Sequence, residues 1–284
     1  MNNTLELKKI NKIVSYDEII RILKIKNDDV VFASGSLIEG MQGKYSQKMG
    51  NSNSDLDIFI IRSHESYGES KSVLSDEVKK TCFAEIDGLG YDVEIYDECV
   101  IQKLIKAISL AEYSQDKKSE SMIKLPAGWK LNDANLFLNC FYYSIVLQNE
   151  KKYTELREHT LFSHFLKFEK AFIINLIDNF IEDVVGNLKD GSEDTALFVM
   201  RDIVVKVAAY LIMCEGEFIN KDKWAILKLK NVINKTGKYQ KFIDLYDVLF
   251  LRNMQNSKEI EDAVRWSLQK TNEILDDLLL DELL

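Results

Sequence analysis

Hydrophobic and polar residues follow two different periods along the chain, and the period predicts where strands and helices lie. Val30 to Ala33 form an apolar run that ends at Ser34, and residues 56–62 form a second run of mainly β-branched and aromatic side chains. Residues 91–96 alternate between acidic and less polar side chains. These three segments predict β-strands, because alternate residues of a strand face opposite sides of a sheet.

Apolar residues at helical spacing predict helices over residues 16–25, near 73–84 and from Glu98 onward. Pro126 is the only proline, and after it the chain becomes almost wholly helical. The helices expected in this second part cover residues 133–149, 152–186, 193–215, 221–234, 238–254 and 257–280.

The order of these elements predicts an α+β protein with two domains. Residues 1–125 are expected to form a mixed β-sheet flanked by helices, and residues 126–284 an all-α domain. We place the boundary at Pro126 because the composition changes there from mixed to helical.

The composition of the chain restricts its partners. The 284 residues are 46% hydrophobic and carry a formal net charge of −9, with acidic excess in both halves and no stripe of lysine and arginine. Proteins that bind a long nucleic acid neutralise its phosphates with surfaces rich in lysine and arginine. The charge therefore disfavours long nucleic acid and favours a compact binding partner.

Four cysteines lie far apart without a C-x-x-C pair, which favours reduced thiols over a zinc site or a small disulfide scaffold. The first residues lack the apolar core of a signal peptide, and the longest apolar run, Val207 to Cys214, is too short to span a bilayer. We therefore expect a cytoplasmic protein without a membrane span.

Two carboxylates stand side by side at the start of the second predicted strand. Asp55 and Asp57 are two residues apart, so they face the same side of the strand, where like charges repel unless a cation neutralises them. Hard oxygen ligands without neighbouring histidine or cysteine favour Mg²⁺ or Mn²⁺. The alternative is that these aspartates only cap a strand or turn, where aspartate is common.

The pair Gly35-Ser36 follows the first strand directly. A glycine after a buried strand lets the backbone turn tightly and approach a ligand, and the N–H groups of a following helix would face an anion. We therefore expect a phosphate-binding turn at Gly35 and Ser36, close to the metal-binding aspartates.

In these four residues, Gly35, Ser36, Asp55 and Asp57, the chain resembles the nucleotidyltransferase superfamily that includes DNA polymerase β and the aminoglycoside nucleotidyltransferases. The shared pattern is Gly-Ser, a variable loop, and two aspartates flanking one apolar residue. The loop between Ser36 and Asp55 is longer than in compact members. The resemblance implies that Asp55 and Asp57 bind divalent metal and that Gly35 and Ser36 bind nucleotide.

The resemblance also implies a third acidic residue on a neighbouring strand. The run from Val93 to Asp97, followed by a helix, resembles the kanamycin nucleotidyltransferase pattern, whose strand glutamate corresponds to Glu94. Glu94 would then be a catalytic metal ligand or a general base. Asp92 faces the same side of the strand and is the alternative third carboxylate.

Residues 200–229 resemble the helical C-terminal domain of aminoglycoside nucleotidyltransferase-like proteins. By that resemblance Lys223 would bind the triphosphate, and Arg201 or Lys206 would face the nucleotide cleft. A lysine in a first helical turn is also common at solvated positions, which is the other interpretation of Lys223.

The function implied is that of an enzyme that transfers a nucleoside monophosphate from a nucleoside triphosphate, with ATP expected, to an acceptor. A small molecule such as an antibiotic is the expected acceptor. Two alternatives stay open: transfer to a protein or tRNA end or synthesis of an oligonucleotide messenger, and a non-catalytic nucleotide-binding or antitoxin-like module.

Overall fold

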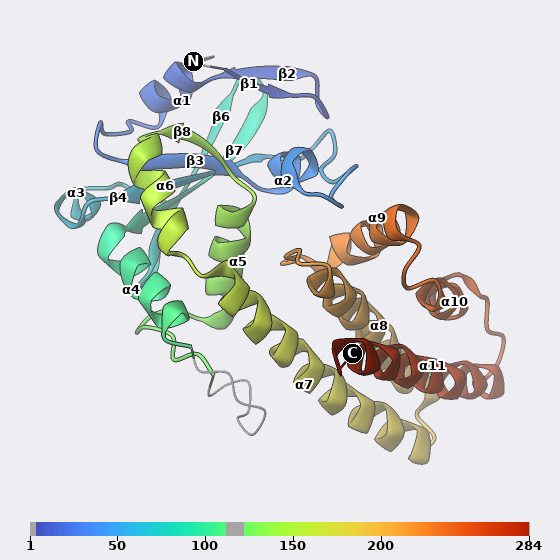
Figure 1. Cartoon of the computed structure of the whole chain (residues 1–284). Coiled ribbons are helices and arrows are strands. Elements are labelled where there is room, and N and C mark those ends of the chain that lie inside the picture. The colour runs from blue at the N-terminus through green and yellow to red at the C-terminus, as the bar shows by residue number, and fades with distance from the viewer. Residues whose placement is uncertain (1–3, 112–121, 284) are drawn as a thin grey trace. The chain divides into compact units, whose positions relative to one another are not determined.

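The computed structural model describes residues 4–111 and 122–283, which form two compact units, residues 1–165 and 166–284 (Figure 1). The first unit contains a mixed β-sheet with helices, and the second is helical. The predicted α+β class is therefore confirmed. Among the described residues, no helix is long and apolar enough to cross a membrane.

A six-stranded sheet forms the framework of the first unit, in the order β5-β6-β7-β4-β3-β8. Only the central pair, β4 and β7, is parallel among the pairings described for this sheet. The strands are β3 (Val30–Ser34), β4 (Leu56–Arg62), β5 (Leu74–Ser75), β6 (Lys79–Ile86), β7 (Leu89–Asp97) and β8 (Ile145–Gln148). The parallel pair lies at the centre because it needs a crossover connection and cover on both faces.

One face of this sheet is aliphatic. Val31, Ile58 and Val93, one from each central strand, are buried in a common core. The same core includes side chains from the hairpin of β1 (Thr4–Leu7) and β2 (Lys12–Ser15) and from helices α1 (Tyr16–Ile22) and α2 (Ser36–Gln42). The alternation of the strands thus buries every second residue on this side.

The opposite face is aromatic along much of its length. Phe32 stacks on Phe59 with ring centroids 5.1 Å apart, and Tyr96 stacks on Trp129 at 6.0 Å. Phe137, from α5 (Leu131–Tyr142), lies within 6.4 Å of all four of these rings. This cluster fixes α5 on the sheet through large, well-packed rings.

Two segments differ from the elements expected from the sequence. Residues 73–84, expected to be helical, contain β5 and most of β6. The helix expected over 133–149 ends at Tyr142, and the chain then forms β8. The β6–β7 hairpin turns at Asp87 and Gly88, both with positive φ, so pairing with β7 overrides the helical spacing of the sequence.

The first compact unit extends beyond Pro126, where the composition changes. β8 pairs with β3, and the Ser34 hydroxyl lies 2.7 Å from the carbonyl oxygens of both Cys140 and Tyr143, so that it donates to either one. Helix α6 (Glu150–His159) follows β8, and α7 (Phe162–Lys189) begins within the same unit. The helical composition after Pro126 therefore includes elements that complete the sheet unit.

A buried ion pair joins the far end of β4 to the turn before β3. The Arg62 guanidinium donates to both carboxylate oxygens of Asp29, and both side chains are at most 6% exposed. Removing either partner of such a pair leaves an uncompensated buried charge, which typically costs about 3–5 kcal/mol. The pair therefore holds β4 in place at the end opposite Asp55.

The second unit consists of the rest of α7, α8 (Glu193–Cys214), α9 (Ala225–Thr236), α10 (Lys241–Tyr246) and α11 (Ser257–Leu283), with a short 3-10 helix at Asp222–Trp224 and a short π-helix at Asp247–Leu251. Helix α8 supplies much of its core, with Met200, Ile203 and Val207 fully buried. Lys228 is also buried, and its ammonium donates to the Phe218 carbonyl oxygen.

Glu169, on α7, is 2% exposed, and burial raises its pKa to about 8 although Lys206 acts in the opposite direction. Between about pH 4.5 and 8 the unfolded chain loses this proton while the folded chain keeps it, so stability falls as the pH rises, by up to about 1.4 kcal/mol per pH unit. Glu169→Gln should therefore raise the melting temperature at pH 8 and change it little at pH 4.5.

The matched control is Glu182→Gln, which changes an exposed residue of the same helix. Thermal unfolding of wild type and both variants across this pH range measures the effect. An equal shift for Glu169→Gln at all pH values would contradict the proposed linkage between burial and protonation.

Candidate functional site

The turn after β3 is built around a close approach between Gly35 and Asp57. Gly35 has φ of 85° and ψ of −173°, a conformation that residues other than glycine rarely adopt. A Cβ atom placed on Gly35 would lie 1.5 Å from Oδ2 of Asp57. The glycine predicted from the sequence to leave room for a ligand therefore leaves room, in this structure, for the Asp57 carboxylate.

A second glycine makes space for the other aspartate. Gly90 lies in β7, and a Cβ atom placed on it would come within 2.1 Å of Oδ1 of Asp55. Asp55 is exposed, whereas Asp57 is half-buried. Both carboxylates thus occupy positions at which the neighbouring strand or turn has no side chain. From the sequence alone Gly90 is only part of a turn, and no local pattern connects it with the site.

The parallel register between β4 and β7 places one further acid beside this pair. Asp57 pairs directly with Asp92, and Phe59 pairs with Glu94. Asp57, Asp92 and Glu94 all face the side of the sheet that carries the aromatic cluster, because residues of equal parity share a face. Asp92 is therefore the acidic neighbour of Asp57, and Glu94 lies two residues further along the strand.

Glu94 has two strong partners of its own. The Lys79 ammonium contacts its Oε1 at 2.5 Å, and the Tyr96 hydroxyl donates to Oε2 at 2.6 Å. Lys79 and Glu94 are each about one-seventh exposed. Burial and the Glu94 carboxylate raise the pKa of Tyr96 well above its usual value, so the hydroxyl keeps the proton that it donates. Neither Lys79 nor Tyr96 was expected at the site.

The long loop between α2 and β4 contains several buried side chains. Tyr45, Ser46 and Met49 are buried within it, and the Ser46 hydroxyl donates to Oε1 of Glu39 in α2. At its end the Ser36 hydroxyl lies 3.5 Å from the hydroxyl of Ser54, which immediately precedes Asp55. The loop therefore brings Ser36 next to the start of β4.

The donor atoms at this end of the sheet suit a hard divalent cation. Asp55, Asp57 and Asp92 offer only carboxylate oxygens, which Mg²⁺ and Mn²⁺ prefer. Three acids on one face repel each other, and a bound cation offsets that repulsion. Among the described residues, the trio whose potential ligand atoms lie within 4.8 Å of one another is a different one, His64, Asp97 and Cys99.

The residues expected to bind nucleotide from the helical part lie in the second compact unit. Lys223 is exposed, and its ammonium lies 5.4 Å from the ring centroid of Trp224. Arg201 donates to the Leu249 carbonyl oxygen, and Lys206 forms an ion pair with Asp222 at 2.8 Å. Arg201 and Lys206 thus have structural partners within this unit.

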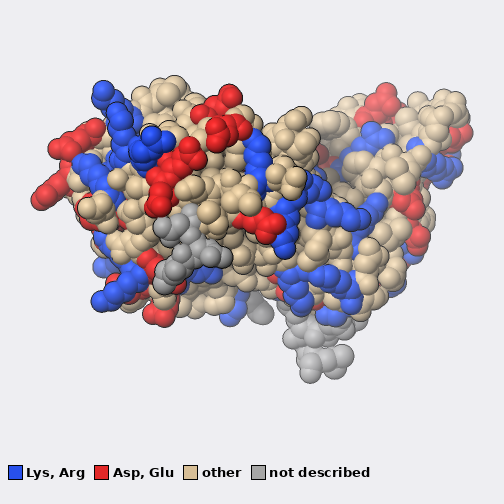
Figure 2. Space-filling model, turned by 90° about the horizontal axis from the view of Figure 1, so that it is seen from above, with Lys and Arg blue, Asp and Glu red and all other residues tan. Residues whose placement is uncertain are grey.

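The charged surface matches the mixed composition of the sequence. Figure 2 shows lysine and arginine side chains interspersed with aspartate and glutamate over the face that it draws.

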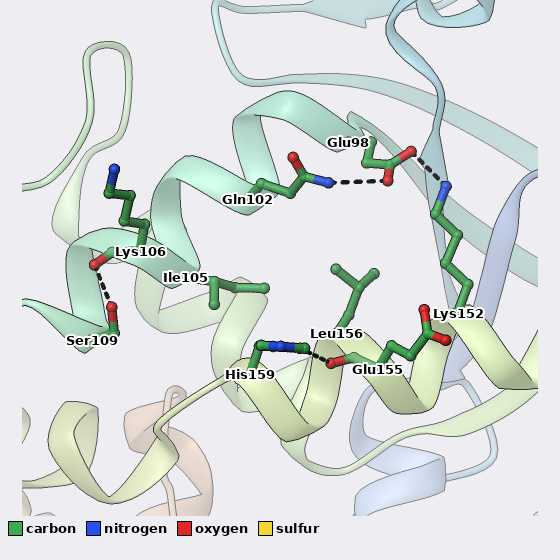
Figure 3. Close-up of a pocket in the computed structure, with 9 residues that line it drawn as sticks. All are labelled: Glu98, Gln102, Ile105, Lys106, Ser109, Lys152, Glu155, Leu156 and His159. Atoms are coloured by element: carbon green, nitrogen blue, oxygen red, sulfur yellow. Dashed lines mark hydrogen bonds and ion pairs between the residues drawn. The ribbon is translucent and has the colours of Figure 1, made fainter.

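A separate pocket of about 480 Å³ lies between α4 (Glu98–Ser109) and α6 (Figure 3). An ion pair between Glu98 and Lys152, at 2.5 Å, lines one part of it, and Ile105 and Leu156 line another. Glu98 follows the carboxyl end of β7, whereas Asp92 lies toward the start of that strand. The pocket is therefore distinct from the acidic residues at Gly35.

Gly35→Ala should destabilise the fold by more than the roughly 1–3 kcal/mol of a strained backbone position, because the new methyl group also collides with Asp57. Gly191→Ala is the matched control, since Gly191 has φ of 70° and a Cβ atom placed on it would meet no other atom within 4 Å. Chemical denaturation measures both. The cost of Gly35→Ala should fall in an Asp57→Ala background, and an unchanged cost there would refute the collision.

No protein-family model matches the sequence, and no curated protein matches it. Among solved structures, the chain is similar to a nucleotidyltransferase-like protein from Exiguobacterium sibiricum 255-15. The two chains share 10% sequence identity with a TM-score of 0.48, and the alignment covers 93% of this chain and 74% of that one.

Proposed function

We propose that this protein is a divalent-metal-dependent nucleotidyltransferase, which transfers a nucleoside monophosphate from a nucleoside triphosphate to an acceptor and releases pyrophosphate. One observation carries the proposal: Asp57 lies against the Gly35 turn and pairs in register with Asp92 on the adjacent parallel strand. A metal-binding face and a phosphate-binding turn then meet at one point of the fold, as nucleotidyl transfer requires.

In this proposal Asp55, Asp57 and Asp92 hold Mg²⁺ or Mn²⁺. When bound, the cation neutralises the triphosphate and makes the acceptor hydroxyl more acidic. The two glycines support the assignment, because Gly35 and Gly90 have no side chain where the Asp57 and Asp55 carboxylates lie. Asp92 replaces Glu94 as the preferred third carboxylate, since its register with Asp57 is direct.

In this proposal the turn at Gly35 binds the β- and γ-phosphates, which leave as pyrophosphate. The first N–H groups of α2 lack partners within the helix, and they stand next to the Ser36 hydroxyl. The N–H groups and the Ser36 hydroxyl stabilise an anion bound beside them. Because these hydrogen-bond donors are already oriented, they also stabilise the negative charge that develops on the leaving pyrophosphate. Ser36 would hold the β- and γ-phosphates from one side.

The transfer step needs no oxidant or reductant. The acceptor oxygen or nitrogen forms a bond to the α-phosphorus, the bond between the α-phosphorus and the bridging oxygen breaks, and pyrophosphate leaves with that electron pair. The acceptor proton passes to solvent or to a carboxylate. Glu94 is held by Lys79 and Tyr96, so we assign it a positioning role for this face of the sheet.

We propose ATP as the donor and a small molecule, such as an antibiotic, as the acceptor, acted on in the cytoplasm, where nucleoside triphosphates are abundant. The net charge of −9 and the mixed surface charge support a compact acceptor over a long nucleic acid. The direct test is incubation with each labelled nucleoside triphosphate, Mg²⁺ and a cell extract, followed by mass spectrometry of the product.

That experiment also separates the alternatives. A labelled small molecule supports the proposal, whereas a labelled protein or tRNA end, or an oligonucleotide formed from the triphosphate alone, assigns a different acceptor to the same chemistry. Failure of any label to transfer, together with retained nucleotide binding, would favour a non-catalytic binding module.

The third carboxylate can be identified by opposite effects of two substitutions. Asp92→Asn should lower transfer by about a hundredfold or more, the scale of a lost electrostatic contact, and leave the melting temperature level or higher because a repelling charge is removed. Glu94→Gln should retain more activity but lower the melting temperature, because Lys79 loses its charged partner.

Steady-state rates and thermal unfolding measure both properties, and Asp55→Asn should behave like Asp92→Asn. Glu85→Gln is the control, because it changes an exposed acid of the adjacent strand β6. Loss of activity in Glu94→Gln with full activity in Asp92→Asn would show that Glu94, and not Asp92, is the third metal-binding carboxylate.

We propose further that the helical part supplies a nucleotide contact through Lys223. Lys223→Ala should then weaken binding of the triphosphate by roughly 1–3 kcal/mol, the scale of a lost charge-assisted hydrogen bond. Calorimetric titration in Mg²⁺ at fixed ionic strength measures this, with Lys221→Ala as the control because Lys221 is exposed in the same segment. Equal dissociation constants for all three proteins would remove Lys223 from the site.

A further inference from the structure

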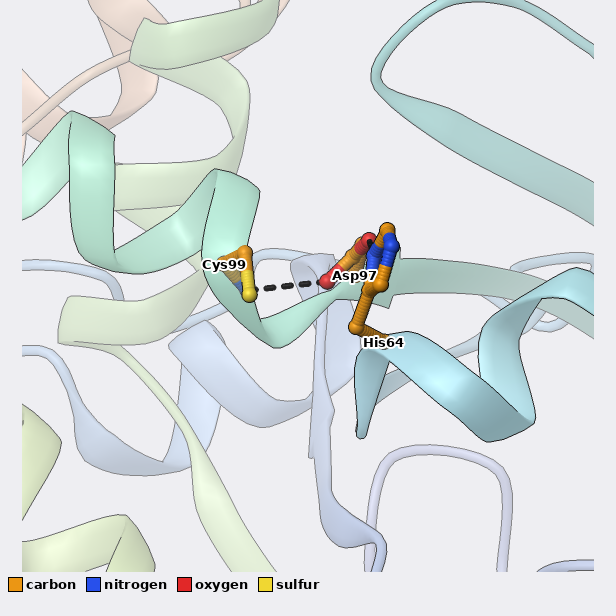
Figure 4. Close-up of side chains that lie close together, drawn as sticks. All are labelled: His64, Asp97 and Cys99. Atoms are coloured by element: carbon orange, nitrogen blue, oxygen red, sulfur yellow. Dashed lines mark hydrogen bonds and ion pairs between the residues drawn. The ribbon is translucent and has the colours of Figure 1, made fainter.

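Three side chains of different chemistry converge where β7 ends, away from the acidic residues at the Gly35 turn. They are His64 at the start of α3 (His64–Gly68), Asp97 at the end of β7 and Cys99 in the first turn of α4. One potential ligand atom from each lies within 4.8 Å of the other two. Figure 4 shows the His64 ring against the Asp97 carboxylate, with Cys99 beside them.

Asp97 is the fixed member of this trio. Its side chain is 7% exposed, and its Oδ1 accepts the backbone N–H of Cys99, which caps α4. Its Oδ2 lies 2.5 Å from Nδ1 of His64. The cap holds the carboxylate in one orientation, so Oδ2 contacts the His64 ring in a defined position. Such support of a ligand by a hydrogen bond is typical of metal sites.

The other two members are accessible. The His64 side chain is 76% exposed, and Cys99 is exposed with a free thiol. An ion from solvent can therefore reach them, and their rotamers can adjust by the small distance that coordination needs. Cys82 shares unit 1 with Cys99, but its thiol contacts the Lys71 carbonyl oxygen and belongs to a different environment.

We propose that His64, Asp97 and Cys99 form a binding site for Zn²⁺ or a similar transition-metal ion, with water as the fourth ligand. Imidazole nitrogen, thiolate sulfur and carboxylate oxygen are the three ligand types of zinc, and this mixture is poorly suited to Mg²⁺. On binding, the Cys99 thiol gives its proton to solvent, and the thiolate and the Asp97 carboxylate together balance the two charges of the ion.

The sequence did not indicate this site because its ligands follow none of the familiar spacings. His64 is far from Asp97 in the chain, and Cys99 has no cysteine partner. The parallel pairing of Arg62 with Asp97 brings the segment after β4 to the end of β7. A bound ion would tie α3 to the start of α4 and stabilise the carboxyl ends of the two central strands.

Cobalt titration of the full-length, reduced protein tests the proposal, because tetrahedral Co²⁺ bound to a thiolate has a charge-transfer band that oxygen ligands alone do not produce. Wild type should bind one equivalent of Co²⁺ and show this band. Added Zn²⁺ should displace the Co²⁺ and remove the band. Cys99→Ser should abolish the band, and His64→Gln should weaken the affinity at least tenfold. Zn²⁺ should raise the melting temperature of wild type but not of Cys99→Ser.

Cys82→Ser and His159→Gln are matched controls, since they remove a second thiol and a second exposed histidine from the same unit. Both should keep the band and the affinity. Absence of the band in wild type, its persistence in Cys99→Ser, or its loss in Cys82→Ser would each overturn the proposal. Circular dichroism of each variant verifies that the fold is intact, because both His64 and Cys99 are exposed.

Discussion

The register between β4 and its two neighbours is the constraint on which the rest of the structure depends. Asp57 pairs with Ser34 of β3 and with Asp92 of β7. This one row of paired residues across three strands therefore fixes the positions of the Gly35 turn and of the two aspartates. A shift of one residue would turn Asp57 into the aliphatic core and place Ile58 on the face that carries the acidic residues. The cost of burying a charge among apolar side chains excludes that shift.

The sequence predicted the central strands well. The predicted limits of β3 and β4 agree with the structure, and β7 is longer than predicted by residues at both ends. These strands are recognisable because they are buried on both faces, or alternate regularly, over their whole length. The long helices α8 and α11 were predictable for the same reason, since their apolar residues repeat at helical spacing over many turns.

The edges of the sheet and the detail of the site were not predictable from the sequence. β6 consists mostly of half-buried residues such as Lys79 and Thr81, whose strand conformation depends on pairing with β7. Parity alone did not separate Asp92 from Glu94, because both face one side. Our proposal prefers Asp92 because of its pairing with Asp57 on the neighbouring strand, and such pairing joins residues that are distant in the sequence.

The stack of Trp129 on Tyr96 gives this protein a natural optical probe. Tyr96 donates to Glu94, and Glu94 lies on the same face as the proposed metal-binding acids, so the indole is linked to that face through two contacts. The other two tryptophans belong to the second compact unit. Emission from Trp129, isolated by replacing the other two, would therefore follow events on the acidic face of the sheet without an attached dye.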